Sequence, residues 1–392
     1  MSFIVCCCKK VNTFSQWAEQ YRVLTHQMIS KQALCKRITE GAAKFCQALL
    51  EDVIAKQTNK QMELSLFKKF EKVMVQDSTT LKLQDGLSAS FPGNHSNGMQ
   101  KAVARIQSVL DIKRMQFVHF SVSGFTRNDQ AASPDIITHC SKNDLVIRDM
   151  GYFATSAFKK LISEGVYILS RLRFGVNIYD LKGKPIALRS LLRRGQKVDR
   201  IVLIGEKKLR FRLVILPVPA AVAAAKIRKA KNDRDHRLHH SKDYYRWLEF
   251  NIYITNVSNQ IWSSCQVAKA YKVRWLIEII FKSWKTGGLE MQELLHERCT
   301  TKERVKCCIY LLLAFITMFT SNLFLPALCK SIQKENKKAV SILKMMRWVC
   351  DNITEVFNLS IHKIINQSLI YCCYEKRKDR SNMILIALNC KP

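Results

Sequence analysis

The chain has 392 residues, and its 64 lysines and arginines against 31 aspartates and glutamates give a formal net charge of +33. Such an excess is too large for solubility alone and indicates a polyanionic partner, with nucleic acid the leading candidate and ribosomes or acidic membranes the alternative. The 15 cysteines include adjacent ones and no Cys-x-x-Cys pair, which argues against a disulfide framework and a zinc ribbon and fits a reducing cytoplasm.

Residues 1–70 are predicted to form a basic, helical N-terminal region. Apolar residues recur there at three- and four-residue steps, which is the period of an amphipathic helix. The short apolar run before Lys9 and Lys10 is not a secretory signal. Such helices could bind DNA or simply pack, and the sequence leaves both open.

The period changes to alternation at residues 73–83, which predicts a strand. Asp77 falls on the same face of this strand as Val75 and Thr79. A carboxylate among apolar neighbours needs a partner or a metal ion. A turn or cap residue is the alternative for an aspartate followed by Ser78.

A second short strand is predicted at residues 144–149, and Asp149 ends it in alternation with Ile147. The side chain of Asp149 is therefore expected on the same face of the strand as that of Ile147, the face toward the core. The competing carboxylates are Asp85, Asp129 and Asp144. Asp85 and Asp144 stand beside turn residues or at a strand start, where solvent exposure is expected.

Several strand-like runs follow, at 166–172, 198–204, 209–216 and 247–255. Between them, the stretch from Ala220 to Lys242 is rich in lysine and arginine, so it could follow a DNA backbone or form a disordered basic loop. Its histidines have no cysteine or strand frame around them and are expected to be solvated rather than bound to a metal; they are His236, His239 and His240.

The segment from Tyr271 to Lys285 is predicted to be one helix with a charged stripe. At about 100° per residue, Tyr271, Arg274, Glu278 and Lys285 fall within an arc of about 60°. An exposed ion pair between Arg274 and Glu278 is the alternative. The rest of the circumference is apolar, however, and a charged stripe on so apolar a helix indicates a face that meets an anion together with a metal ion.

An uncharged segment, Ile309 to Leu328, is long enough to cross a bilayer. Ser321, Asn322 and Pro326 weaken that interpretation. We expect a buried core helix instead, with no membrane partner.

The spacing Tyr-x2-Arg-x3-Glu-x6-Lys, formed by Tyr271, Arg274, Glu278 and Lys285, resembles the signature of a large family of bacterial insertion-sequence transposases of the DDE type. Asp77, followed by small hydroxyl residues, and Asp149, followed by Gly151 and Tyr152, resemble the two upstream aspartates of that family. Thr255-Asn256 is similar as well. The resemblance covers about residues 70–325 and implies an RNase H-like core.

The resemblance implies that Asp77, Asp149 and Glu278 are the catalytic residues and hold two Mg²⁺ ions, with Mn²⁺ as a substitute. It further implies that Tyr271, Arg274 and Lys285 bind DNA. The expected function is metal-dependent endonuclease cleavage at transposon ends and strand transfer into target DNA, in the cytoplasm at the bacterial nucleoid. The expected partner is double-stranded DNA, with a homodimer in the complex. An RNase H-like nuclease and an inactive DNA-binding transposase remnant are the alternatives.

The expected fold class is α/β, an RNase H-like catalytic core with a β-strand-rich insertion and helical N- and C-terminal regions. The separation 278 − 149 = 129 residues is too long for a minimal core, so an insertion is expected between the last two carboxylates, as the resemblance also implies. The predicted boundaries are a helical region at 1–70, the first part of the core at 71–160, a β-rich basic insertion at 161–255, core helices at 256–328 and a helical C-terminal region at 329–392.

Overall fold

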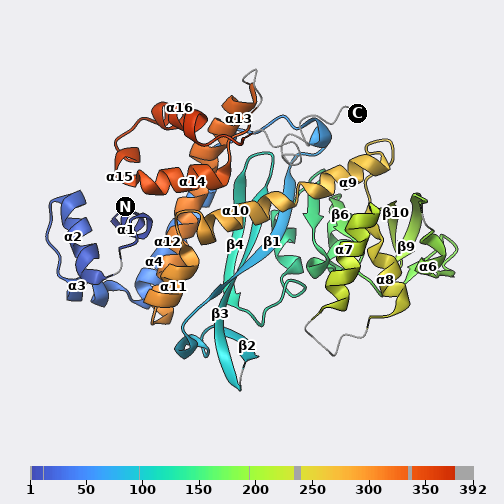
Figure 1. Cartoon of the computed structure of the whole chain (residues 1–392), viewed down its shortest axis with the longest axis horizontal. Helices are drawn as coiled ribbons and strands as arrows, with labels where there is room; N and C mark the ends of the chain where they lie inside the picture. The colour runs from blue at the N-terminus through green and yellow to red at the C-terminus, as the bar shows by residue number, and fades with distance from the viewer. Residues whose placement is uncertain are drawn as a thin grey trace. The chain divides into compact units, whose positions relative to one another are not determined.

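The computed structural model (Figure 1) describes residues 2–375 except 12, 97, 194, 234–239 and 334–337. The chain forms two compact units, and each is built from separate stretches of sequence. Of the described residues, unit 1 contains those up to Glu63, Asp77–Asn128, and those from Trp275 onward. Unit 2 contains Leu64–Gln76 and Asp129–Arg274.

Unit 1 begins with short helices whose starts are fixed by hydroxyl side chains. Thr13, Ser30 and Thr39 each accept a hydrogen bond from the backbone amide three residues on, which satisfies one of the free amides of a helix N-terminus. The helices are α1 (Ser2–Cys8), α2 (Phe14–Thr25), α3 (Lys31–Arg37) and α4 (Glu40–Ala55).

The strands of unit 1 surround β3 (Met99–Asp111), which pairs with β2 (Pro92–Ser96), with β4 (Gln116–Gly124) and with β1 (Val73–Lys82). β3 and β4 form an antiparallel hairpin that runs from Ala104 opposite Gly124 to Asp111 opposite Gln116. A short 3₁₀ helix, Asp85–Leu87, follows β1. β1 enters unit 1 at Asp77, because its first four residues belong to unit 2.

Helices make up the C-terminal part of unit 1. They are α10 (Trp275–Thr286), α11 (Met291–Arg298), α12 (Lys302–Met318), a π-helical turn (Phe319–Phe324), α13 (Leu325–Gln333), α14 (Ile342–Asp351), α15 (Ile353–Val356) and α16 (Ile361–Tyr371). In the described part of the chain, the continuous run 302–333 is the one helix long and apolar enough to cross a membrane, and 67% of its most apolar stretch is buried inside the protein. Leu312, Leu313 and Ile316 are fully buried, so the burial predicted for residues 309–328 is confirmed.

Unit 2 is organised around a sheet with the strand order β1–β5–β6–β11–β10–β9–β7–β8. β1 is parallel to β5, and β5 is parallel to β6, whereas the remaining pairs are antiparallel. The strands are β5 (Leu145–Arg148), β6 (Tyr167–Arg171), β7 (Ile178–Tyr179), β8 (Pro185–Ile186), β9 (Val198–Ile204), β10 (Leu209–Pro217) and β11 (Phe250–Thr255). All four residues of β5 are buried, as expected for a parallel strand covered on both faces.

Helices and 3₁₀ turns connect the strands of unit 2. They are the 3₁₀ helices Ser65–Phe67, Ser133–His139 and Met150–Tyr152, with α5 (Thr155–Ser163), α6 (Leu188–Leu191), α7 (Ala220–Lys231), α8 (Lys242–Leu248) and α9 (Ser264–Lys272). The disordered loop considered for the basic stretch is wrong for residues 220–231, which form α7. Four other basic and histidine positions of that stretch lie outside the described residues, namely Arg234, His236, Arg237 and His239. The His240 ring stacks on Tyr244, and Lys242 begins α8.

The predicted α/β fold class with helical N- and C-terminal regions is confirmed. The single helix predicted for residues 271–285 is wrong, because α9 ends at Lys272 and α10 begins at Trp275. The amides of Val273 and Arg274 donate to carbonyl oxygens three residues back, those of Ala270 and Tyr271. This tightening into a 3₁₀ turn ends the α-helical register.

Candidate active site

Asp77 lies in β1, where the strand changes from complete burial to alternation. Val73 to Gln76 are all buried, Asp77 is half-buried, and beyond it Thr79 and Leu81 are buried while Lys82 is exposed. The backbone amide of Ser78 donates to Asp77 Oδ1 at 2.8 Å. The hydroxyl of Ser108 donates to the Asp77 carbonyl oxygen at 3.3 Å. Both the main chain and the carboxylate of Asp77 are therefore held within unit 1.

Asp149 directly follows β5 and leads into the 3₁₀ turn at residues 150–152. Its backbone is extended, with φ −83° and ψ 168°, so the chain keeps the strand direction for one more residue. A Cβ at Gly151 would lie 3.1 Å from Asp129 Oδ2, so the glycine lets the turn pass close to that second carboxylate. Asp149 itself is half-buried.

Tyr271 connects α9 to Asp149 within unit 2. Its hydroxyl donates a hydrogen bond to Asp149 Oδ1 at 2.8 Å. Burial raises the pKa of Tyr271 well above its usual 10, and the Asp149 carboxylate raises it further. The hydroxyl therefore keeps its proton at neutral pH and remains a donor to the carboxylate.

Arg274 lies in the turn after α9 and is only 5% exposed. Its Cζ atom is 5.8 Å from the centroid of the Tyr271 ring, within the range of a cation–π contact. The structure therefore brings together three of the predicted site residues in unit 2, namely Asp149, Tyr271 and Arg274.

Glu278 and Lys285 lie on α10, in unit 1. Seven residues separate them, which places them within about 20° of each other on the helix. Both are half-buried, and burial lowers the pKa of Lys285. The apolar circumference predicted for this helix is not buried throughout, because Trp275 at its start is 51% exposed.

Two of the competing carboxylates have structural partners. Asp85 is exposed and forms an ion pair with Lys101 at 2.7 Å, as its position beside a turn suggested. The solvent exposure expected of Asp144 is wrong, because Asp144 is fully buried. It accepts hydrogen bonds from the backbone amides of Lys72 at 3.0 Å and Ser141 at 2.8 Å, so it joins two chain segments.

Among the described residues, no group of three or more His, Cys, Asp and Glu side chains is arranged to hold a metal ion. The three-carboxylate metal site therefore stays a prediction. The donor chemistry of Asp77, Asp149 and Glu278 does suit a hard cation, since Mg²⁺ takes oxygen ligands. None of the three is sealed in the core.

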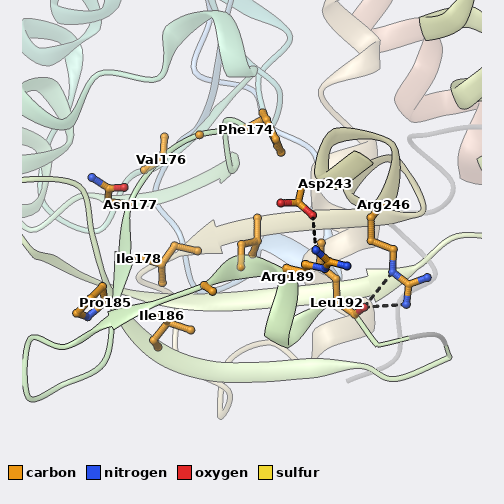
Figure 2. A pocket seen from close by; sticks show the side chains of 13 residues that line it. Phe174, Val176, Asn177, Ile178, Pro185, Ile186, Arg189, Leu192, Asp243 and Arg246 are labelled. Atoms are coloured by element: carbon orange, nitrogen blue, oxygen red, sulfur yellow. Dashed lines mark hydrogen bonds and ion pairs between the residues drawn. The ribbon is translucent and has the colours of Figure 1, made fainter. Parts of the chain in front are cut away.

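A separate cavity of about 500 Å³ lies in the strand-rich part of unit 2 (Figure 2). Apolar side chains such as Phe174, Ile178 and Ile186 form much of its wall. Its charged groups already have partners. Arg189 pairs with Asp243 at 3.6 Å, and Arg246 donates through Nε and Nη2 to the carbonyl oxygen of Leu192 (Figure 2).

One basic residue near Asp149 escaped the sequence analysis, Arg171 at the end of β6. Lys226 on α7 belongs to the basic stretch from Ala220 to Lys242. Arg171 lies in a strand that reads as ordinary core. The signal that could have found it is the parallel pairing of its strand with the strand of Asp149, which pattern alone does not provide.

The chain was compared with known proteins. The family model described as "Transposase DDE domain" matches residues 68–318. The transposase for insertion sequence element IS231F of Bacillus thuringiensis subsp. israelensis is 26% identical over 356 residues, covering 84% of this chain and 73% of that protein. The transposase for insertion sequence element IS1151 of Clostridium perfringens is 26% identical over 337 residues, covering 79% and 70%.

Among solved structures, a piggyBac transposase synaptic complex with hairpin DNA matches 97% of this chain and 76% of that chain. The sequences are 9% identical and the TM-score is 0.41. A similarity at that level is too low to support a conclusion about this protein.

Proposed function

The chain belongs to the transposase DDE domain family, and from this premise we propose that Asp77, Asp149 and Glu278 are its catalytic residues and metal ligands. The reaction is cleavage of DNA at the ends of an insertion sequence, followed by joining of those ends to target DNA. The observation that carries this proposal is the hydrogen bond between Tyr271 and Asp149. It joins the family-like helix segment to the second aspartate across 122 residues of sequence.

Three carboxylates are the donor set for two Mg²⁺ ions, and Mn²⁺ would serve as a substitute because it prefers the same oxygen ligands. When bound, such a pair of ions activates the attacking water or 3′-hydroxyl and stabilises the leaving oxygen. Asp77 would contribute from β1, Asp149 from the end of β5 and Glu278 from the first turn of α10.

The protein's own side chains orient this chemistry. The Tyr271 hydroxyl holds one oxygen of Asp149 and leaves the other free to act as a ligand. Arg274 and Lys285 contact phosphates of the bound end. Arginine suits bidentate phosphate binding, whereas lysine acts as a point charge. Burial has lowered the pKa of Lys285, and contact with a phosphate would favour its charged form.

The partners in this proposal are the inverted-repeat ends of the element and its target DNA, bound by a homodimer in the bacterial cytoplasm at the nucleoid. The net charge of +33 supports a polyanionic partner. The strand-rich segment at 161–255 would act as an insertion whose basic residues follow the DNA backbone.

The test of the three carboxylates is cleavage and strand transfer of a duplex from the end of the element in Mg²⁺. Asp77→Asn, Asp149→Asn and Glu278→Gln should each abolish both products and leave DNA binding intact, whereas the exposed control Asp85→Asn should keep full activity. A variant that still cuts would remove its residue from the site. Cleavage without any joined product by the unaltered protein would favour a nuclease.

The phosphate contacts have a separate test. Arg274→Ala and Lys285→Ala should weaken assembly on paired ends. Each should also lower the slope of log affinity against log salt concentration by about one, for the one phosphate contact that is lost. Unchanged affinity and unchanged salt dependence in both variants would show that neither residue binds phosphate.

A further inference from the structure

The parallel pairing of β5 with β6 places Arg171 at the level of Asp149. The register pairs Arg148 with Ser170, so the next residue on each strand, Asp149 and Arg171, stand level at the carboxyl ends. Side chains alternate along a strand, so these two point to the face opposite that of Arg148 and Ser170. A cation thus lies beside a proposed catalytic carboxylate.

The same face carries two tyrosines. Tyr253 on β11 is the register partner of Arg171, and its ring centroid lies 5.2 Å from that of Tyr271. Burial raises the pKa of both tyrosine hydroxyls, and the positive charge of Arg171 partly opposes this rise. Arg171 is therefore close enough to act on Tyr271, the residue that holds Asp149.

Lys226 supplies a second cation at this place. Its Nζ donates to Asn251 Oδ1 at 3.1 Å. Burial and, to a smaller extent, repulsion by Arg171 lower the pKa of Lys226 to about 8. Two positive side chains on β6 and α7 thus lie near enough to repel each other.

Neither cation has an acidic partner among the residues that the structure describes. The Nε–H of Arg171 is buried and donates to no hydrogen-bond acceptor there, and the Arg171 Cζ lies 5.9 Å from the Trp247 ring centroid. The buried Arg212, by contrast, is paired with Asp199 at 2.6 Å. Two like charges held close together, with no ion pair to either of them, are unfavourable until an anion joins them.

We propose that Arg171 and Lys226 form a phosphate-binding subsite, which grips one backbone phosphodiester of the DNA strand that lies at Asp149. The guanidinium would bind two phosphate oxygens and the ammonium would add a point charge. This inference rests on the proposed function and extends it, since the phosphate contacts proposed for the family-like segment are Arg274 and Lys285, whereas Arg171 and Lys226 lie outside it.

The experiment measures binding of the full chain to a fluorescent duplex from the end of the element, in Ca²⁺ and over a salt series. Arg171→Gln and Lys226→Gln should each bind roughly tenfold more weakly and lower the salt slope by about one. Lys363→Gln, which removes an exposed charge from α16 outside the strand-rich segment at 161–255, is the matched control and should change neither quantity. Unchanged binding by both test variants would overturn the proposal.

A second measurement separates phosphate contact from a structural role. Duplexes are prepared with one neutral methylphosphonate linkage at successive positions. One linkage should weaken binding of the unaltered protein, and that effect should disappear in Arg171→Gln and Lys226→Gln. Both variants should also melt at or above the original temperature without DNA, since they remove uncompensated charge. The proposal would be overturned if both variants still lost affinity at the same methylphosphonate position as the unaltered protein. It would also be overturned if they melted at a lower temperature and bound every duplex equally weakly.

This readout is independent of cleavage. If the carboxylate variants of the proposed function still cut DNA, that function fails while the linkage profile still decides the subsite. If cleavage depends on the carboxylates and the linkage profile does not change, the subsite alone fails.

Discussion

The Tyr271 hydroxyl donates a hydrogen bond to the Asp149 carboxylate. A phenol whose pKa is raised well above 10 by burial and by the neighbouring carboxylate stays protonated throughout the physiological range. It therefore remains a donor, and the carboxylate that accepts at 2.8 Å is held in one orientation. We infer from this that Tyr271 positions Asp149.

Tyr271→Phe removes this hydrogen bond and keeps the ring. We expect cleavage to fall by about tenfold or more, because a hydrogen bond to a charged group contributes about 1.5–3 kcal/mol. The fall should appear in the rate of a preassembled complex and not in DNA affinity. Tyr253→Phe is the control, since the ring of Tyr253 packs against that of Tyr271 at a tilt of 52°. Equal rates for the two variants would show that the hydroxyl has no positioning role.

Lys226 gives the protein a pH dependence at the scale of one residue. Its pKa of about 8 lies below the usual 10.5, so the charge is present at pH 7 and is lost as the pH rises through 8. Arg171 is the charged group that faces it, and Asn251 is its hydrogen-bond acceptor. The folded state bears the cost of the buried charge below pH 8, and stability rises as the pH goes from there toward 10.5.

DNA affinity should change in the opposite direction. With the subsite in use, binding of end DNA should weaken between about pH 7 and about pH 9, because Lys226 loses its charge. Lys226→Arg keeps a charge throughout this range and should flatten the profile. Anisotropy at constant ionic strength measures both proteins. Parallel pH profiles would contradict the assignment of this dependence to Lys226.

At the scale of elements, the sequence predicted the strands well and one helix poorly. The alternation around Asp77 and the runs at 198–204 and 209–216 correspond to β1, β9 and β10. The helix across residues 271–285 was predicted from periodicity, which cannot detect a break that keeps apolar residues on both sides. Val273 and Arg274 are buried in the turn itself, and neither a glycine nor a proline marks it.

The site shows the same limit. Asp77, Asp149 and Glu278 could be proposed from strand ends and from the Tyr-x2-Arg-x3-Glu-x6-Lys spacing. Arg171 could not, because its place beside Asp149 follows from which strands pair and in what register. Asp144 was misjudged for a related reason, since its partners are backbone amides at Lys72 and Ser141. Contacts made through the main chain leave no mark in side-chain patterns.

The apolar helix α12 carries a prediction of its own. Leu312 is fully buried within unit 1, so Leu312→Asp should lower the free energy of unfolding by more than about 3 kcal/mol or make the protein insoluble. Met318, on the same helix, is 42% exposed, and Met318→Asp should be tolerated. Thermal melting of both variants provides the measurement. Recovery of the unaltered protein in carbonate-resistant membranes would contradict burial of this helix in a soluble fold.

At the scale of the whole molecule, the net positive charge should determine how strongly the protein binds DNA. A net charge of +33 should make DNA binding steeply dependent on salt, with a loss of roughly a thousandfold between about 50 and about 200 mM. Arg228 and Lys229 are exposed on α7, and replacing both with glutamine should lower the slope by about two. Binding titrations at several salt concentrations test this. A slope near zero would show that the basic excess serves another partner.

Because of the turn at Val273–Arg274, the spacing Tyr-x2-Arg-x3-Glu-x6-Lys is not the periodicity of a single helix. Tyr271 belongs to α9, and Glu278 and Lys285 belong to α10, so no single helical repeat fixes all four positions. The sequence separation between Glu278 and Lys285 corresponds to two turns of α10. The separation between Tyr271 and Glu278 instead includes the turn that connects α9 to α10. Selection would therefore act on residue number in that connection, and a one-residue insertion there should be far more damaging than a change of helix-forming tendency on either side.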